Sequence, residues 1–220
     1  MALSPARTVA RMLLEAEAVH VRPDRPFALD ANRWSPIYID TRKLFGSPRM
    51  RRRLVELLRE RVIDDIGFDA FDTVAGGETA GIPLAAWLAD ALMLPMVYVR
   101  KQPKGFGRNA RIEGRLTDGQ RVLMVDDAAV DGTSKLGFVD GLREAGAVAH
   151  HGVVPFAYDL WPAGKSAMAA AGFTLHAIAT LRDLLDEVAA GGALPSATLA
   201  AVEQFAAAPD AWHANGCGTS

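Results

Sequence analysis

Residues 121–135 read RVLMVDDAAVDGTSK, an apolar run that stops at two adjacent carboxylates, Asp126 and Asp127. A short loop that contains Gly132 follows, and a helical pattern begins at about Ser134. This order predicts a buried strand, a loop and the N-terminus of a helix. Backbone N–H groups at a helix N-terminus bind anions, and glycine lets the backbone approach them closely. The stretch therefore predicts a phosphate-binding loop within an α/β fold.

Strand and helix patterns alternate along the chain on both sides of this stretch. Strands are predicted over 35–40, 72–75, 96–99, 121–125, 148–156 and 174–179. Helices are predicted over 5–19, 48–66, 82–92, 134–145, 162–171, 181–190 and 196–207. Such alternation predicts a mostly parallel central sheet flanked by helices, with ligands bound beyond the carboxyl ends of the strands.

Composition excludes several classes of protein. At about 150 residues per domain, the 220 residues are expected to form a single domain. Lys and Arg number 24 against 26 Asp and Glu, so the net charge of −2 gives no reason to expect nucleic-acid binding. The single cysteine, Cys217, excludes an internal disulfide and a cysteine-built metal site. No apolar run is long enough for a membrane span, and the amphipathic N-terminus is unlike a signal peptide, so a cytoplasmic protein is expected.

The two carboxylates and the glycine loop favour different parts of one ligand. Asp126 and Asp127 do not bind a phosphate themselves, but they suit ribose hydroxyls or a divalent ion beside it. A ribose phosphate is a ligand that needs both halves. The alternative is a helix whose acidic residues merely interact favourably with the positive end of its dipole.

A second glycine-rich turn is predicted at residues 76–79, GGET, between a strand and a helix. Its backbone N–H groups are suited to a second anion, although a simple tight turn has the same pattern. A third segment is strongly basic and contains Gly105 and Gly107. Its five cations are Arg100, Lys101, Lys104, Arg108 and Arg111. Such a segment is typical of a loop that closes over an anionic ligand, or of a solvated basic loop.

These segments resemble a known family. Residues 121–135 resemble the ribose-phosphate-binding motif of type I phosphoribosyltransferases. Residues 35–44 (SPIYIDTRKL), 74–83 (VAGGETAGIP) and 98–107 (YVRKQPKGFG) resemble the orotate phosphoribosyltransferases within that group. The tail, with Leu175-His176-Ala177 and the helices after it, is similar to the bacterial branch with an extended C-terminus. The resemblance covers nearly the whole chain.

The resemblance implies a type I phosphoribosyltransferase-like fold in a single domain over 1–220. It implies an N-terminal hood over about 1–45, a core over about 68–180 and a helical C-terminal extension over about 181–220. It also implies the activity: transfer of ribose-5-phosphate from phosphoribosyl pyrophosphate to orotate, in the biosynthesis of UMP. A homodimer that shares the basic loop across its interface is expected.

The same resemblance implies a role for each candidate site residue. Catalysis is expected of Lys104 and Asp127. Binding of ribose and its 5-phosphate is expected of Asp126, Asp127, Val130, Asp131, Gly132, Thr133 and Ser134. Binding of pyrophosphate is expected of Gly77, Glu78, Thr79, Arg100, Lys101, Lys104 and Arg108. Tyr38 is expected near orotate, and Mg²⁺ is expected to bridge substrate oxygens with no protein ligand beyond Asp126 and Asp127.

Several positions depart from the pattern of the family. Ala129 and Val130 stand where many members have threonines, and Phe106 stands where many have a histidine. Asp30 occupies the position of an upstream lysine, and residues 156–159 contain no arginine where an orotate-binding one is usual. These departures leave open a divergent paralogue that binds phosphoribosyl pyrophosphate without turnover, or one that uses another nucleobase.

Overall fold

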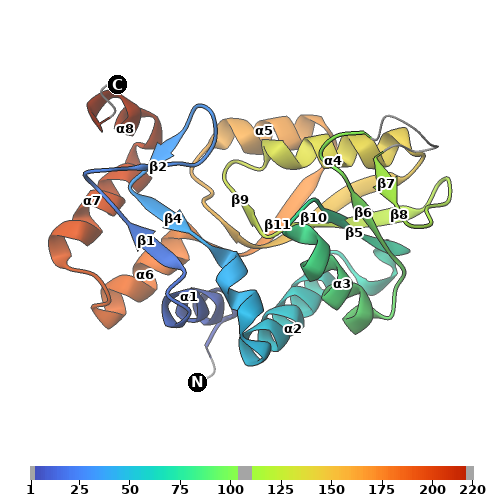
Figure 1. Ribbon diagram of the computed structural model, residues 1–220, viewed down its shortest axis with the longest axis horizontal. Helices are drawn as coiled ribbons and strands as arrows, with labels where there is room; N and C mark the ends of the chain where they lie inside the picture. The colour runs from blue at the N-terminus through green and yellow to red at the C-terminus, as the bar shows by residue number, and fades with distance from the viewer. Residues whose placement is uncertain (1–2, 104–110, 217–220) are drawn as a thin grey trace.

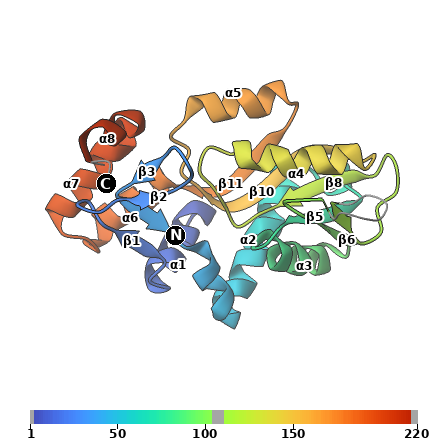
Figure 2. The same ribbon diagram turned by 45° about the horizontal axis from the view of Figure 1, so that its top comes forward.

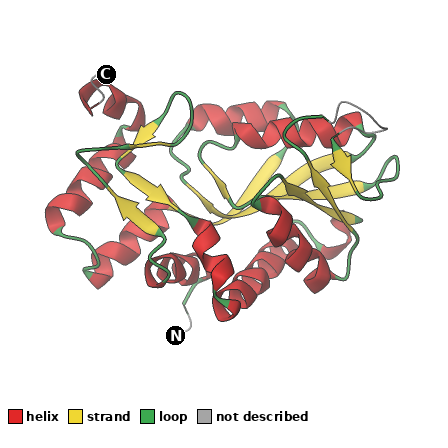
Figure 3. Ribbon diagram, in the orientation of Figure 1, coloured by secondary structure: helices red, strands yellow, loops and turns green. Residues whose placement is uncertain are grey.

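A seven-stranded sheet forms the centre of the molecule (Figures 1 and 3). The computed structural model describes residues 3–103 and 111–216. The strands are β5 (Thr73–Gly77), β6 (Met96–Val99), β7 (Ile112–Glu113), β8 (Arg121–Val125), β9 (Ala128–Ala129), β10 (Val148–Ala157) and β11 (Thr174–Thr180). Their order is β11-β10-β8-β5-β6-β7, with β9 beside β10. All neighbours are parallel except β6 and β7, so the prediction of a mostly parallel sheet is confirmed.

Helices cover both faces of this sheet. On one side lie α2 (Pro48–Asp65) and α3 (Gly81–Leu92), and on the other lie α4 (Thr133–Glu144) and α5 (Pro162–Ala170) (Figure 1). The side chains of strand β8 alternate between two hydrophobic clusters. Leu123 and Val125 belong to one cluster, and Val122 and Met124 belong to the other, so successive positions are apolar. A central parallel strand is buried on both faces, because helices pack against each of them.

The N-terminal and C-terminal segments lie together at one end of the molecule (Figures 1 and 2). They comprise α1 (Pro5–Glu15), β1 (Val19–Val21), β2 (Phe27–Ala28), β3 (Trp34–Ser35), β4 (Ile37–Ile39), α6 (Leu181–Gly191), α7 (Ser196–Ala207) and α8 (Pro209–Gly216). Arg7 and Arg11 of α1 both pair with Glu187 of α6, whose side chain is only 6% exposed. A buried carboxylate of α6 and two half-exposed arginines of α1 therefore join the two ends of the chain. The division into hood, core and extension stays a prediction.

Local signals account for the elements that were predicted well. The hydroxyl of Ser47 accepts the N–H of Met50, and Pro48 begins α2, so the cap and first residue are as the sequence predicts. The helix predicted over 5–19 is shorter, because Glu17 has a positive φ of 52° and ends it.

The strand predicted over 35–40 is divided at Pro36, which has no N–H to donate to a ladder. Its first part, β3, pairs with β2, and its second, β4, pairs with β1. The short 3-10 segments Thr41–Gly46 and Phe68–Ala70 and the helix α8 carry no strong sequence signal. Among the helices of the described ranges, none is both long and apolar enough to cross a membrane.

Candidate active site

A cavity of about 530 Å³ opens where β5 and β8 end. It brings together residues from three predicted segments: the carboxylate pair, the GGET turn and the basic segment. Its lining residues are Arg42, Glu78, Thr79, Ala80, Lys101, Arg111, Asp126, Asp127, Ser134, Lys135, Gly137 and Phe138. The carboxyl ends of parallel strands meet at one edge of a sheet, so ligand sites of α/β proteins gather there.

Close packing of glycines brings the two predicted anion-binding turns side by side. A Cβ on Gly81 would lie 2.5 Å from the carbonyl oxygen of Val125 and 3.0 Å from Oδ1 of Asp126. A Cβ on Gly76 would lie 2.8 Å from the carbonyl oxygen of Gly81. Because no side chain fits at these two positions, the N-terminus of α3 rests directly on the end of β8.

The two adjacent carboxylates have different surroundings. Asp126 is buried, its Oδ2 is paired with Nζ of Lys135, and its Oδ1 accepts the N–H of Asp127 at 2.9 Å. The side chains of Asp126 and Lys135 are each only 8% exposed. The Asp126 carboxylate is therefore held in place by contacts within the protein, whereas the Asp127 carboxylate is the more accessible of the two.

Burial raises the pKa of Asp127 to about 6, and the neighbouring charge of Asp126 acts in the same direction. Lys135 and Arg42 oppose the shift without cancelling it. A carboxylate with a raised pKa, held in a cavity, is typical of a functional site, because the fold keeps a charge there at a cost in stability. Binding of hydroxyl groups or a cation favours the ionised form and offsets that cost.

We expect Asp127→Asn to stabilise the unliganded protein at neutral pH. The folded pKa of about 6 lies above the ordinary 3.8, so folding favours the protonated acid, and this contribution is lost as pH rises through about 6. Asparagine has no charge to bury and should raise the free energy of unfolding at pH 8 by about 1–3 kcal/mol. Chemical denaturation of both proteins measures the difference, which should vanish near pH 4. A difference in the free energy of unfolding that does not change with pH would contradict the raised pKa of Asp127.

The predicted phosphate loop runs from β9 to the start of α4. Gly132 adopts a positive φ of 85°, and a Cβ there would meet Sδ of Met168 at 2.5 Å. Oδ1 of Asp131 accepts the amide of Thr133 at 3.0 Å and its hydroxyl at 2.8 Å. The Asp131 carboxylate and the Thr133 hydroxyl are thus used within the loop, and Ser134 is the hydroxyl residue that lines the cavity.

Three residues of this loop line a second cavity of about 400 Å³, on the side of α5. They are Val130, Asp131 and Gly132, and Trp161, Lys165 and Met168 lie on the same cavity. The loop therefore separates two hollows. Asp127 and Ser134 belong to the first, so only part of the predicted ribose-phosphate set converges on it.

The GGET turn is held by its neighbours. The amide of Glu78 donates to the carbonyl of Val99 at 2.9 Å, so this N–H is used by the sheet. The Glu78 carboxylate accepts the amide of Lys101 at 2.8 Å, and the Glu78–Thr79 peptide bond is cis. A Cβ on Gly77 would lie 2.8 Å from the ring of Phe138, so Gly77 serves packing. Thr79 and its successor Ala80 are the turn residues that line the cavity beside Glu78.

The basic residues divide into those on the cavity and those beside it. Lys101 and Arg111 line it, and Nη2 of Arg111 also donates to the carbonyl of Gly137 at 2.6 Å. Arg100 is not among the lining residues, and its guanidinium lies 3.8 Å from the carboxylate of Glu113. Lys104 and Arg108 lie outside the described residues.

Sequence reasoning missed two cations of the cavity, Arg42 and Lys135, and it named Arg111 in the basic segment without giving it a role of its own. Each lies in a stretch that drew attention, but no local signal sets it apart from its neighbours. Arg42 donates to Asp40 at 2.6 Å and to the hydroxyl of Tyr38 at 3.2 Å. Tyr38 itself does not line the cavity, and its ring lies against Phe27 with 5.6 Å between centroids.

Within the described residues, no group of three or more His, Cys, Asp or Glu side chains is arranged to hold a metal ion. His151 and His176 interact at 3.3 Å, and His176 also faces Asp65 at 3.0 Å. These histidines join β10, β11 and α2 rather than the cavity.

Known proteins with similar sequences share one name, orotate phosphoribosyltransferase. No protein-family model matches the chain. The chain is 54% identical to the orotate phosphoribosyltransferase of Cereibacter sphaeroides (strain KD131) over 207 residues, which cover 94% of this chain and 89% of that protein. It is 50% identical to the orotate phosphoribosyltransferase of Roseobacter denitrificans, with 94% and 92% covered.

Solved structures with a similar fold include an orotate phosphoribosyltransferase and a UMP synthase. Orotate phosphoribosyltransferase from Aeropyrum pernix superposes with a TM-score of 0.71 at 33% identity, covering 84% of this chain and 99% of that one. UMP synthase of Leishmania donovani superposes with a TM-score of 0.78 at 27% identity, covering 92% of this chain and 42% of that one.

Proposed function

The chain belongs to the orotate phosphoribosyltransferase family of pyrimidine biosynthesis, and from that premise we propose how its residues carry out the transfer. One observation supports the proposal above the others. Thr79 after β5, Asp127 after β8 and Ser134 in the first turn of α4 line one cavity together with cations. We infer that Asp127 contacts the ribose hydroxyls, the start of α4 contacts the 5-phosphate, and Thr79 with Lys101 contacts pyrophosphate.

The reaction breaks the bond between C1 of ribose and the pyrophosphate oxygen, whose electron pair leaves with pyrophosphate. A bond forms from C1 to N1 of orotate, and N1 loses its proton to solvent. Positive charge develops on the ribose and negative charge on the leaving pyrophosphate. Asp127 is suited to the first charge, and Arg42, Lys101 and Arg111 are suited to the second. Lys104 is proposed as the catalytic cation, and Arg108 as a pyrophosphate ligand. The remaining contribution is positioning, because holding both substrates in line removes much of the entropic barrier.

Mg²⁺ is proposed as the cofactor, and the donor set fits it. Asp126 and Asp127 supply carboxylate oxygens, and Mg²⁺ keeps several waters and substrate phosphate oxygens rather than a complete protein cage. When bound, the ion neutralises pyrophosphate charge. Because Asp126 is already paired with Lys135, Asp127 is the better candidate to contact the ion.

A homodimer that shares the basic loop across its interface is proposed; light scattering on the purified protein measures its mass. A position beside orotate is likewise proposed for Tyr38, since Arg42, which lines the cavity, donates a hydrogen bond to its hydroxyl.

A cytoplasmic location is proposed from the pathway in which the family acts.

Release of pyrophosphate from phosphoribosyl pyrophosphate and Mg²⁺ tests the proposal. We expect release that depends on orotate and does not occur with uracil or adenine in its place. Binding of phosphoribosyl pyrophosphate without release would favour a paralogue that has lost turnover. Release with another base alone would change the assigned substrate and leave the proposed phosphoribosyl site intact.

A further inference from the structure

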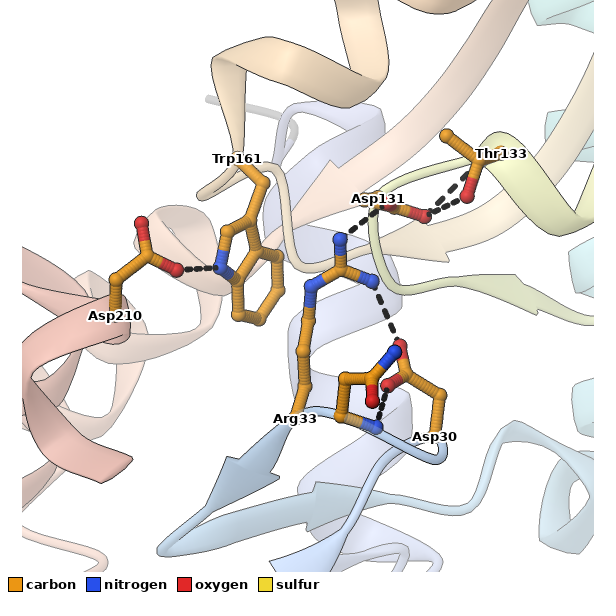
Figure 4. Close-up of polar contacts among 7 residues, drawn as sticks. Asp30, Arg33, Asp131, Thr133, Trp161 and Asp210 are labelled. Carbon is orange, nitrogen blue, oxygen red and sulfur yellow. Dashed lines mark hydrogen bonds and ion pairs between the residues drawn. The ribbon is translucent and has the colours of Figure 1, made fainter. Parts of the chain in front are cut away.

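A guanidinium from the N-terminal segment reaches the phosphate loop (Figure 4). Arg33 lies just before β3, and its Nη2 is 2.7 Å from Oδ2 of Asp131, nearly one hundred residues further along the chain. Its Nη1 donates to Oδ2 of Asp30 at 2.7 Å. The Asp131 side chain is only 6% exposed and that of Arg33 is 26% exposed, so the pair is well shielded from water.

Residues from two further segments of the chain hold the Arg33 side chain in position. Its guanidinium stacks on the ring of Trp161, 5.1 Å from the centroid, and Trp161 is buried. The indole Nε1 of Trp161 donates to Oδ1 of Asp210 in α8 at 3.0 Å. Figure 4 shows the ring of Trp161 alongside Arg33 and between it and Asp210. The N-terminal segment, the start of α5 and the C-terminal helix thus converge on one guanidinium.

Asp131 would be unfavourable in a phosphate loop without this partner. Its Oδ1 holds the amide and the hydroxyl of Thr133, which shapes the first turn of α4. Its negative charge, however, lies within the loop proposed to receive the 5-phosphate, and like charges in a site shielded from water repel strongly. Arg33 bonds the other oxygen and neutralises the charge.

We propose that Arg33 is a positioning residue of the 5-phosphate loop, which acts through Asp131 by neutralising its carboxylate and holding it on Thr133. The inference rests on the proposed function, because it takes residues 130–134 as the 5-phosphate site. Arg33 itself is not assigned a substrate contact. It lies between two carboxylates, Asp30 and Asp131, so the three groups together carry one negative charge and form a poor anion ligand.

Steady-state kinetics of Arg33→Ala, Asp131→Asn and the double variant test this role. We expect Arg33→Ala to raise KM for phosphoribosyl pyrophosphate about tenfold or more, the size expected when one member of a shielded charge pair is removed. KM for orotate and kcat should change much less, because the loss concerns binding of one substrate. In the double variant, KM for phosphoribosyl pyrophosphate should return most of the way to the wild-type value. Asparagine keeps the acceptor for Thr133 and removes the uncompensated charge.

Arg22→Ala is the matched control. Arg22 is an exposed arginine of the same segment that stacks on Phe27 at 4.8 Å, and its kinetics should be those of wild type. The recovery in the double variant separates the proposal from a folding defect, because a misfolded variant does not regain substrate affinity when a second residue is changed. Arg33→Lys should lie between wild type and Arg33→Ala, because one ammonium group replaces the two-sided guanidinium.

Two results would overturn the role of Arg33 while leaving the proposed function in place. One is an unchanged KM for phosphoribosyl pyrophosphate in Arg33→Ala, measured on an enzyme whose wild type is active with orotate. The other is a double variant with a higher KM than Arg33→Ala. Failure of the proposed function is a different observation: wild-type protein that releases no pyrophosphate with orotate. In that case, direct titration of wild type and variants with phosphoribosyl pyrophosphate still tests the loop.

Discussion

Asp126→Asn should lower the free energy of unfolding by about 3–5 kcal/mol, the cost of removing one member of a buried ion pair. The ammonium of Lys135 would remain in a place where it is only 8% exposed, without the carboxylate that pairs with it. A domain is stable by only about 5–15 kcal/mol, so the loss should be large in relative terms. Urea denaturation followed by far-ultraviolet circular dichroism measures it. A change below about 1 kcal/mol would contradict the described pair.

The double variant Asp126→Asn with Lys135→Met is the matched control. It removes both charges and leaves an apolar side chain of similar length, and such replacements of buried pairs are often neutral for stability. We expect it to recover most of the stability that Asp126→Asn loses. Turnover should not recover, because both residues line the cavity proposed to bind substrate. Recovery of turnover as well would limit Asp126 and Lys135 to a role in folding.

Lys104→Ala should lower kcat by about 10²–10³-fold, the effect typical of removing one group that stabilises developing charge in a transition state. The resemblance assigns this lysine to the leaving pyrophosphate, whose negative charge grows as the bond to ribose breaks. KM for phosphoribosyl pyrophosphate should change much less, because the charge is greatest in the transition state. Stopped-flow measurement of pyrophosphate release in a single turnover isolates the chemical step.

Lys165→Ala is the control for Lys104→Ala, since Lys165 is an exposed lysine whose nearest partner is Asp159 at 2.8 Å. It should keep the kcat of wild type. A near-normal single-turnover rate in Lys104→Ala would remove this lysine from the catalytic step. Slow turnover with a normal chemical step would instead assign it to product release.

The sequence alone was sufficient for the elements of the core, because their signals are local. Four successive apolar residues over 122–125 indicate a strand buried on both faces, and the structure has them in β8, after the exposed Arg121. A serine and a proline, Ser47 and Pro48, mark the start of α2 where the structure has it. Each of these signals depends on neighbours within a few residues, and the parallel sheet follows from their order.

The sequence also indicated which turns line the candidate site, because ligand sites of parallel sheets follow the carboxyl ends of strands. It could not show which residues of each turn face the cavity and which make contacts within the protein. Asp126 and Asp127 are adjacent and chemically identical, yet one is paired with Lys135 and the other has a raised pKa. That difference depends on the position of Lys135 in α4, because its ammonium pairs with Asp126, whereas Asp127 is partly buried beside the Asp126 charge.

Contacts between distant residues were decided by tertiary structure alone. Pairing of β1 with β4 across Pro23 and Pro26, and the separate pairing of β2 with β3, has no strong local pattern. The meeting of Arg33 with Asp131 requires the N-terminal segment to lie beside the loop before α4. Local periodicity and capping determine which elements form. The side chains that meet are determined by how these elements pack, because a contact depends on the positions of both partners in space.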